Sequence, residues 1–304
     1  MFLIMDKMKP QVFGTFLVTS LSSFELGRDY LKTGRRRFTK QIFSQEGIEA
    51  YRNSCLLATL PQLSFIFYED KGLPEEANTA LHYLVMENKV LLNKDISFLS
   101  SLSNLNTLNL KGNDLGKRIT TLTTLTHLYT LNAGSNKLRQ HITGLAGLIN
   151  LHSLDLTYNY VKEHITVLTC LTNLHTLYVG DNDLSKHVTA LAGLTNLHTL
   201  DLAHNNIEEH ITALTTLTNL HTLNVMCNKL GKHVTTLTAL TNLHTLNARM
   251  NNLRQHITGL TGLTNLHTLD LAWNNLEEQD ISGFTNLRAL NVSFNNLDEH
   301  ATAF

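Results

Sequence analysis

The sequence of 304 residues has little cysteine, little proline and no excess of either charge. Its three cysteines, Cys55, Cys170 and Cys227, are odd in number and widely spaced, which argues against a disulfide framework and indicates a reducing compartment. Three prolines are too few for a proline-rich linker. Lys and Arg number 24 against 25 Asp and Glu, so the composition gives no electrostatic basis for nucleic acid as the main partner.

Long apolar runs are also missing. No run reaches the roughly 18 residues that a membrane-spanning helix needs, so we expect no integral membrane segment. The apolar segment 12–21 follows Lys7 and Lys9, and a weak signal segment is one interpretation of it. Asp6 interrupts the basic region, however, which favours the first helix or strand of a packed N-terminal region.

The motifs of common enzymes and cofactor sites are absent. There is no glycine-rich phosphate loop, no Gly-x-Ser-x-Gly, no His-Glu-x-x-His and no Cys-x-x-Cys. We therefore predict a protein without catalysis, cofactor or metal.

An internal repeat dominates the sequence after residue 104. The pattern Leu-x-x-Leu-x-Leu-x-x-Asn-x-Leu recurs every 23 residues, with a last step of 21, and starts at Leu105, Leu128, Leu151, Leu174, Leu197, Leu220, Leu243, Leu266 and Leu287. Within one unit, Leu200 and Leu202 alternate with polar or small residues, as in a short strand with one face inward. Leu214 and Leu217 lie three residues apart, which suits a helical or 3-10 turn. The repeat predicts an α/β solenoid with a parallel sheet on its concave face and short helical turns on its convex face.

Every unit carries one asparagine at the same position. A buried Asn amide supplies two donors and an acceptor, so we expect each to satisfy backbone groups where the strand turns away, in its own turn and the next rung. This structural ladder is Asn113, Asn136, Asn159, Asn182, Asn205, Asn228, Asn251, Asn274 and Asn295.

These units resemble the leucine-rich-repeat family. Their consensus sequence, LTNLHTLxLxxNxLxxHIT, is similar to the repeats of leucine-rich-repeat proteins from intracellular bacteria of the Legionella kind. Many of those proteins are injected into host cells by type IV secretion. The resemblance implies a secreted effector that engages a host protein. It places the chain in a reducing cytoplasm, either of the bacterium or of the host cell.

The N-terminal third lacks the repeat. We expect residues 1–94 to be mostly helical, with Pro74-Glu75-Glu76 opening a capping helix over 74–92 that covers the first rung. Residues 95–304 then form the nine-unit solenoid, with 95–102 as a degenerate half-unit. We expect the last unit to cover its own apolar end with Phe294 and Phe304. The alternative is that two molecules associate through this C-terminal end.

Histidines form two columns. One column follows the first leucine of each unit, and the other lies in the return segment: His152, His175, His198, His221, His244 and His267, and His141, His164, His187, His210, His233, His256 and His300. Rings stacked about 5 Å apart do not converge on one metal ion. Capping and stacking roles are expected. Acid sensitivity is a second hypothesis, because charged neighbours at that distance repel.

The outward positions beside the strands vary while the core does not, which predicts a partner-binding concave face. Aromatic, methionine and arginine side chains are typical of binding hot spots. The candidates are Tyr158, Tyr160, Tyr178, His204, Met226, Arg249, Met250, Trp273 and Phe294. We predict a non-catalytic protein-binding scaffold; the alternative is a ubiquitin-ligase-type adaptor or an enzyme with its activity in residues 1–94.

Overall fold

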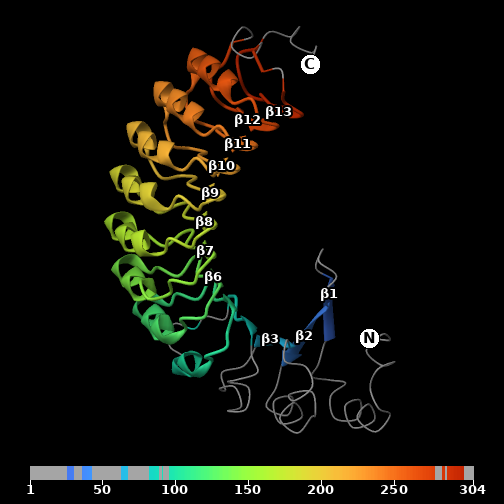
Figure 1. The fold of residues 1–304 in the computed structure, drawn as a ribbon, viewed down its shortest axis with the longest axis vertical. Helices are drawn as coiled ribbons and strands as arrows, with labels where there is room; N and C mark the ends of the chain where they lie inside the picture. The colour runs from blue at the N-terminus through green and yellow to red at the C-terminus, as the bar shows by residue number, and fades with distance from the viewer. Residues whose placement is uncertain are drawn as a thin grey trace.

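The computed structural model describes residues 26–30, 36–42, 63–67, 82–88, 91, 96–277, 283–284 and 286–297. Their strands form one sheet in which sequence order and spatial order are the same from β1 to β13. Figure 1 shows the repeated rungs as an arc, with strands on the inner side and helical turns on the outer side. All neighbouring strands from β2 onward are parallel, whereas β1 and β2 are antiparallel.

The strands are short. Their bounds are β1 Leu26–Tyr30, β2 Arg36–Ile42, β3 Leu63–Phe67, β4 Tyr83–Val85, β5 Thr107–Asn109, β6 Thr130–Asn132, β7 Ser153–Asp155, β8 Thr176–Tyr178, β9 Thr199–Asp201, β10 Thr222–Asn224, β11 Thr245–Asn247, β12 Thr268–Asp270 and β13 Ala289–Asn291. The outer turns are 3-10 helices: η2 Ser97–Ser101, η3 Gly116–Thr124, η4 Arg139–Leu145, η5 Lys162–Cys170, η6 Ser185–Gly193, η7 Glu208–Thr216, η8 Gly231–Ala239 and η9 Arg254–Gly262.

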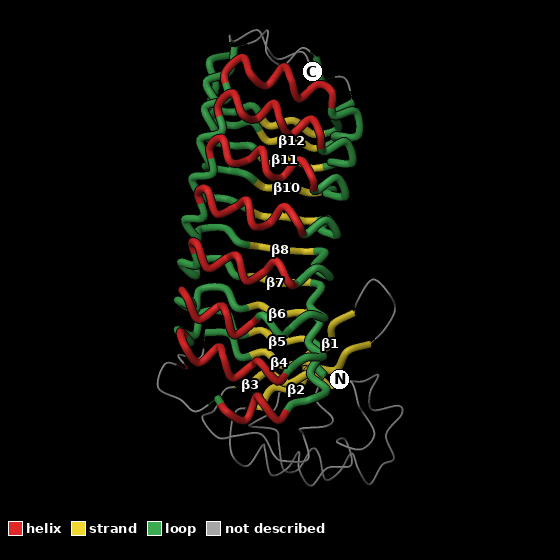
Figure 2. Tube along the Cα trace, turned by 60° about the vertical axis from the view of Figure 1, so that its left-hand side comes forward, coloured by secondary structure: helices red, strands yellow, loops and turns green. Residues whose placement is uncertain are grey.

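One rung explains the others. Leu200 in β9 and Leu202 just after it are buried, and Leu214 in η7 is buried on the opposite side of the same core. Leu200 pairs in register with Leu223 of the next strand, so leucines of successive rungs lie above one another. Figure 2 shows the helical turns stacked in front of the strands in the same order. Because each rung covers the apolar faces of its neighbours, the core is continuous along the solenoid. The predicted α/β solenoid is confirmed.

From β4 to β13, the chain leaves each strand through left-handed backbone. In the rung of β7, the φ angles of Tyr158, Tyr160 and Lys162 are 57°, 57° and 40°. This alternation lets Tyr158 N–H donate to Gly180 O at 3.0 Å and Lys162 N–H donate to Asn182 O at 3.2 Å, so the ladder continues beyond the strand. Left-handed conformation costs a non-glycine residue about 1–2 kcal/mol, and these inter-rung bonds offset that cost.

The structure contains a rung that the sequence analysis assigns to a helix. β4 lies within the predicted 74–92 helix and pairs in parallel with β5, with Leu84 opposite Leu108. Leu84, Met86 and Leu91 are buried in the core, and η2 completes the turn where the half-unit was expected. The helical prediction is wrong at β4, because apolar side chains at these positions fit the repeated core as well as they fit a helix face.

The mostly helical prediction for residues 1–94 is also wrong at β1, β2 and β3, which are strands. The rest of that prediction, the 12–21 segment and Phe304 lie outside the described residues. No helix in the described part of the chain has the length and apolar character needed to cross a membrane.

Candidate functional site

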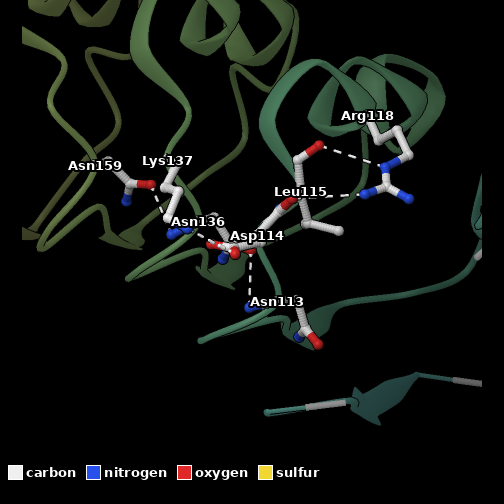
Figure 3. Close-up of polar contacts among 7 residues, drawn as sticks. All are labelled: Asn113, Asp114, Leu115, Arg118, Asn136, Lys137 and Asn159. Carbon is white, nitrogen blue, oxygen red and sulfur yellow. Dashed lines mark hydrogen bonds and ion pairs between the residues drawn. The ribbon is translucent and has the colours of Figure 1, made fainter. Parts of the chain in front are cut away.

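The asparagine ladder forms the strand-to-turn corner. Asn182 Nδ2 donates to the carbonyl oxygens of Leu156, Val179 and Gly180 at 2.9, 3.0 and 3.0 Å. Its Oδ1 accepts from the backbone N–H groups of Asn159 and Val161 at 3.0 and 3.4 Å. The partners therefore lie in the same rung and the preceding rung, not in the following one as expected. Figure 3 shows the corresponding Asn136, whose Oδ1 accepts from the backbone N–H groups of Asn113 and Leu115.

A second asparagine ladder lies at the opposite end of the strands, and the sequence analysis missed it. Each exposed amide donates to a carbonyl 24 residues earlier, or 22 residues earlier at Asn286; Asn196 Nδ2, for example, donates to Thr172 O at 2.9 Å. The seven donors are Asn150, Asn173, Asn196, Asn219, Asn242, Asn265 and Asn286. Their 23-residue spacing from Asn150 to Asn265 was visible in the sequence.

The first histidine column stacks beside this second ladder. Ring centroids of successive members, from His152 to His267, lie 5.0–5.5 Å apart, and Tyr129 stacks on His152 at 4.0 Å. In His198, Nδ1 lies 2.8 Å from Asn196 O. A carbonyl oxygen only accepts, so Nδ1 carries the proton and donates. From His152 to His244, each ring makes this contact with its own loop. The acid-sensitivity hypothesis stays a prediction.

Three exposed tyrosines lie in or just beyond β7 and β8. Tyr158, Tyr160 and Tyr178 expose 52%, 53% and 38% of their surface. Tyr178 ends β8, and the first two follow β7 in the neighbouring rung. The Asp181 carboxylate beside the Tyr158 hydroxyl raises the pKa of that phenol.

An apolar stripe lies over the last rungs. Trp273 and Phe294 stack at 4.5 Å and expose 47% and 67% of their surface. Met250 is also exposed, and its Sδ lies 3.5 Å from Cys227 Sγ. The structure therefore brings Met250, Trp273 and Phe294 together on successive rungs.

Met226, which follows β10, and Arg249, which follows β11, are half-buried. Arg249 Nε is buried without a hydrogen-bond partner, and no ion pair in the described part of the chain involves this guanidinium. Burial raises the pKa of the Cys227 thiol, which Arg249 partly opposes.

The nine candidate residues thus form two groups instead of one. The tyrosines lie over β7 and β8, and the Met, Arg, Trp and Phe side chains follow β10 to β13, with exposed His204 after β9 between them. Among the described residues, no group of three or more His, Cys, Asp or Glu is arranged to hold a metal ion.

Comparison with known proteins agrees with this architecture. The model of the Leucine Rich Repeat family matches residues 196–217 and 265–287. An internalin from Listeria monocytogenes is similar in structure with a TM-score of 0.67 and 22% identity, covering 93% of this chain and 94% of that one. A leucine-rich-repeat protein from Leptospira interrogans has a TM-score of 0.52 and 18% identity, with 86% and 79% covered. A second Listeria internalin is 27% identical with 73% and 84% covered, at a TM-score of 0.49.

No curated protein sequence matches this chain. The family model matches two of the repeats, and the stacked rungs have the fold of a leucine-rich-repeat solenoid. The structures reported above come from Listeria and Leptospira, so they lend no support to the predicted kinship with Legionella-like effectors.

Proposed function

We propose that this protein is a non-catalytic scaffold that binds another protein on its concave face. The observation that carries the proposal is a set of exposed aromatic and methionine side chains in or just beyond β7, β8, β11, β12 and β13: Tyr158, Tyr160, Tyr178, Met250, Trp273 and Phe294. Large exposed aromatic groups on a rigid support lose little conformational freedom on binding and are typical of interface anchors.

The supporting geometry is rigid. Every rung is fixed to its neighbours by strand pairing and by the asparagine ladder, so the side chains on the concave face keep their spacing in the free protein. A preorganised surface of this kind suits recognition of a folded partner or an extended segment.

A pull-down that compares the wild type with two variants tests this proposal. The triple variant Tyr158→Ala, Tyr178→Ala, Trp273→Ala should lose the partner that the wild type recovers, since truncating an anchor costs about 2 kcal/mol or more. The matched control is Tyr129→Ala, which removes an equally exposed aromatic ring from the histidine column. Unchanged recovery by the triple variant contradicts the proposal.

The finer proposal is that the partner is a host protein and that the chain is a type IV secreted effector. It rests on the resemblance of the repeat consensus sequence to the repeats of such effectors. A translocation reporter fused to the full chain tests it, and a secretion-deficient bacterial strain is the control. Absence of the reporter from host cytosol removes the effector role but leaves the scaffold role standing.

A further inference from the structure

The tyrosine group shares the concave face with three aspartates. The sheet register places Tyr178 of β8 between Asp155 of β7 and Asp201 of β9, so the phenol ring rises from the same row as two carboxylates. In the rows beyond the strands, Asp181 lies beside Tyr158. We name Asp155, Tyr158, Tyr178, Asp181 and Asp201 the tyrosine–aspartate cluster.

Small residues lie beside two of these half-buried carboxylates. A Cβ atom added to Gly134 would lie 3.4 Å from Asp155 Oδ1 and 3.5 Å from its Oδ2. A Cβ atom added to Gly180 would lie 3.5 Å from Asp201 Oδ1. Any larger side chain at either glycine would cover the neighbouring carboxylate, so both glycines open the face to a partner.

The cluster keeps its negative charge. Within the part of the chain that the structure describes, no Lys or Arg lies within ion-pair distance of Asp155, Asp181 or Asp201. Lys137 pairs instead with Asp114 and Lys162 with Asp183, each at 2.7 Å. Carboxylates together with exposed aromatic faces are the combination that attracts an organic cation.

We propose that the tyrosine–aspartate cluster receives a lysine or arginine side chain from an exposed segment of the protein partner. The inference rests on the proposed scaffold function and gives that partner its chemistry. The cation lies against the faces of Tyr178 and Tyr158 and is neutralised by the flanking carboxylates.

The test uses dye-labelled hexapeptides, one with two central arginines in a glycine–serine frame and one with two glutamates, and fluorescence anisotropy with the full chain. The informative variant is the double change Asp155→Asn, Asp201→Asn. Asparagine fits these positions, because Asn224 accepts the same backbone bond through its Oδ1 that Asp201 accepts. The variant Tyr178→Asn removes the aromatic ring and also places an asparagine, which fits this row of the sheet.

The matched control is Asp270→Asn. Asp270 lies in the same row and makes the same pair of contacts as Asp201, accepting from the backbone two residues ahead and from an asparagine of the next rung. We expect the arginine peptide to bind the wild type and the control alike. The double variant and Tyr178→Asn should weaken it about tenfold, and the glutamate peptide should not bind.

Equal binding of the arginine peptide to the wild type and the double variant overturns the inference. So does displacement of that peptide by micromolar CaCl2 at constant ionic strength, because the cluster would then be a metal site. If the pull-down partner is lost with the aromatic triple variant but retained by the double aspartate variant, the scaffold function stands and only the basic-segment inference fails.

Discussion

At the residue scale, a single amide holds each corner of the solenoid. Asn182 makes five hydrogen bonds to backbone groups of two rungs while fully buried. Asn173, in the exposed second ladder, donates once, to Ile149 O at 3.0 Å. The two side chains are chemically identical, and their difference in burial decides what each contributes.

Asn182→Ala should lower the free energy of unfolding by about 3–5 kcal/mol, because it leaves buried backbone donors and carbonyls without partners. Asn173→Ala should cost about 1 kcal/mol or less, because water replaces its partner. Urea unfolding followed by circular dichroism measures both. Similar decreases in the free energy of unfolding for the two variants would show that the buried ladder stabilises the protein no more than the exposed one.

Cys227 gives a second prediction at this scale. Its raised pKa, caused first by burial, means that less thiolate is present at pH 8 than in an ordinary exposed cysteine. Arg249 lowers that pKa, so Arg249→Met should raise it further and slow alkylation by iodoacetamide at pH 8. Site-resolved mass spectrometry follows the rate, with exposed Cys170 as the internal reference. Faster alkylation of Cys227 in the variant contradicts this electrostatic account.

Residue-level sequence reasoning succeeded where a column is invariant. It found the nine asparagines, because a fixed spacing reports a fixed place in the rung. It did not anticipate that Tyr158, Trp273 and Phe294 adopt positive φ, because that conformation is imposed by hydrogen bonds between rungs and not by the residues themselves.

At the element scale, the outer turns limit side-chain size where rungs approach closely. A Cβ atom on Gly144 in η4 would lie 3.0 Å from Thr120 Cα and 3.0 Å from Thr120 Cγ2 in the preceding rung. A Cβ atom on Gly193, at the end of η6, would meet no atom within 4 Å.

The two glycines should therefore respond with opposite signs to alanine. Gly144→Ala should destabilise the protein by about 1–2 kcal/mol, because backbone of the preceding rung must shift. Gly193→Ala should stabilise it by about 0.4–1 kcal/mol, because alanine restricts the unfolded chain. Thermal unfolding of the two variants measures both changes in stability. If both variants are destabilised, the close contact with Thr120 does not explain the effect of Gly144→Ala.

The missed β4 rung shows the limit of pattern reasoning at this scale. Lys89 stands where other rungs have asparagine, so the strongest marker of the repeat is absent there. The remaining apolar positions satisfy a helix face as well as a strand and its turn. Only pairing with β5, a contact between distant parts of the sequence, selects the strand.

At the scale of the whole molecule, the solenoid is built from nearest-neighbour contacts. Strand order follows sequence order without a crossover, so each rung depends on the two beside it. Stability is then close to a sum over rungs and interfaces, and a rung removed from the middle leaves two compatible faces. The same regularity fixes the spacing between the tyrosine–aspartate cluster and the apolar stripe of Met250, Trp273 and Phe294.

Deletion of one unit, residues 210–232, tests this whole-molecule view. It joins Glu209 to His233 and keeps the repeat in phase. It removes most of η7, all of β10 and the first two residues of η8, and it shortens the solenoid by one rung, about 4.8 Å. The shortened protein should fold, with a urea m-value lower roughly in proportion to the lost rung. A control deletion of residues 210–220 breaks the phase and should abolish cooperative unfolding. Because both surface groups survive the unit deletion at a shorter separation, a partner that spans them should bind more weakly, whereas the isolated arginine peptide should bind as before.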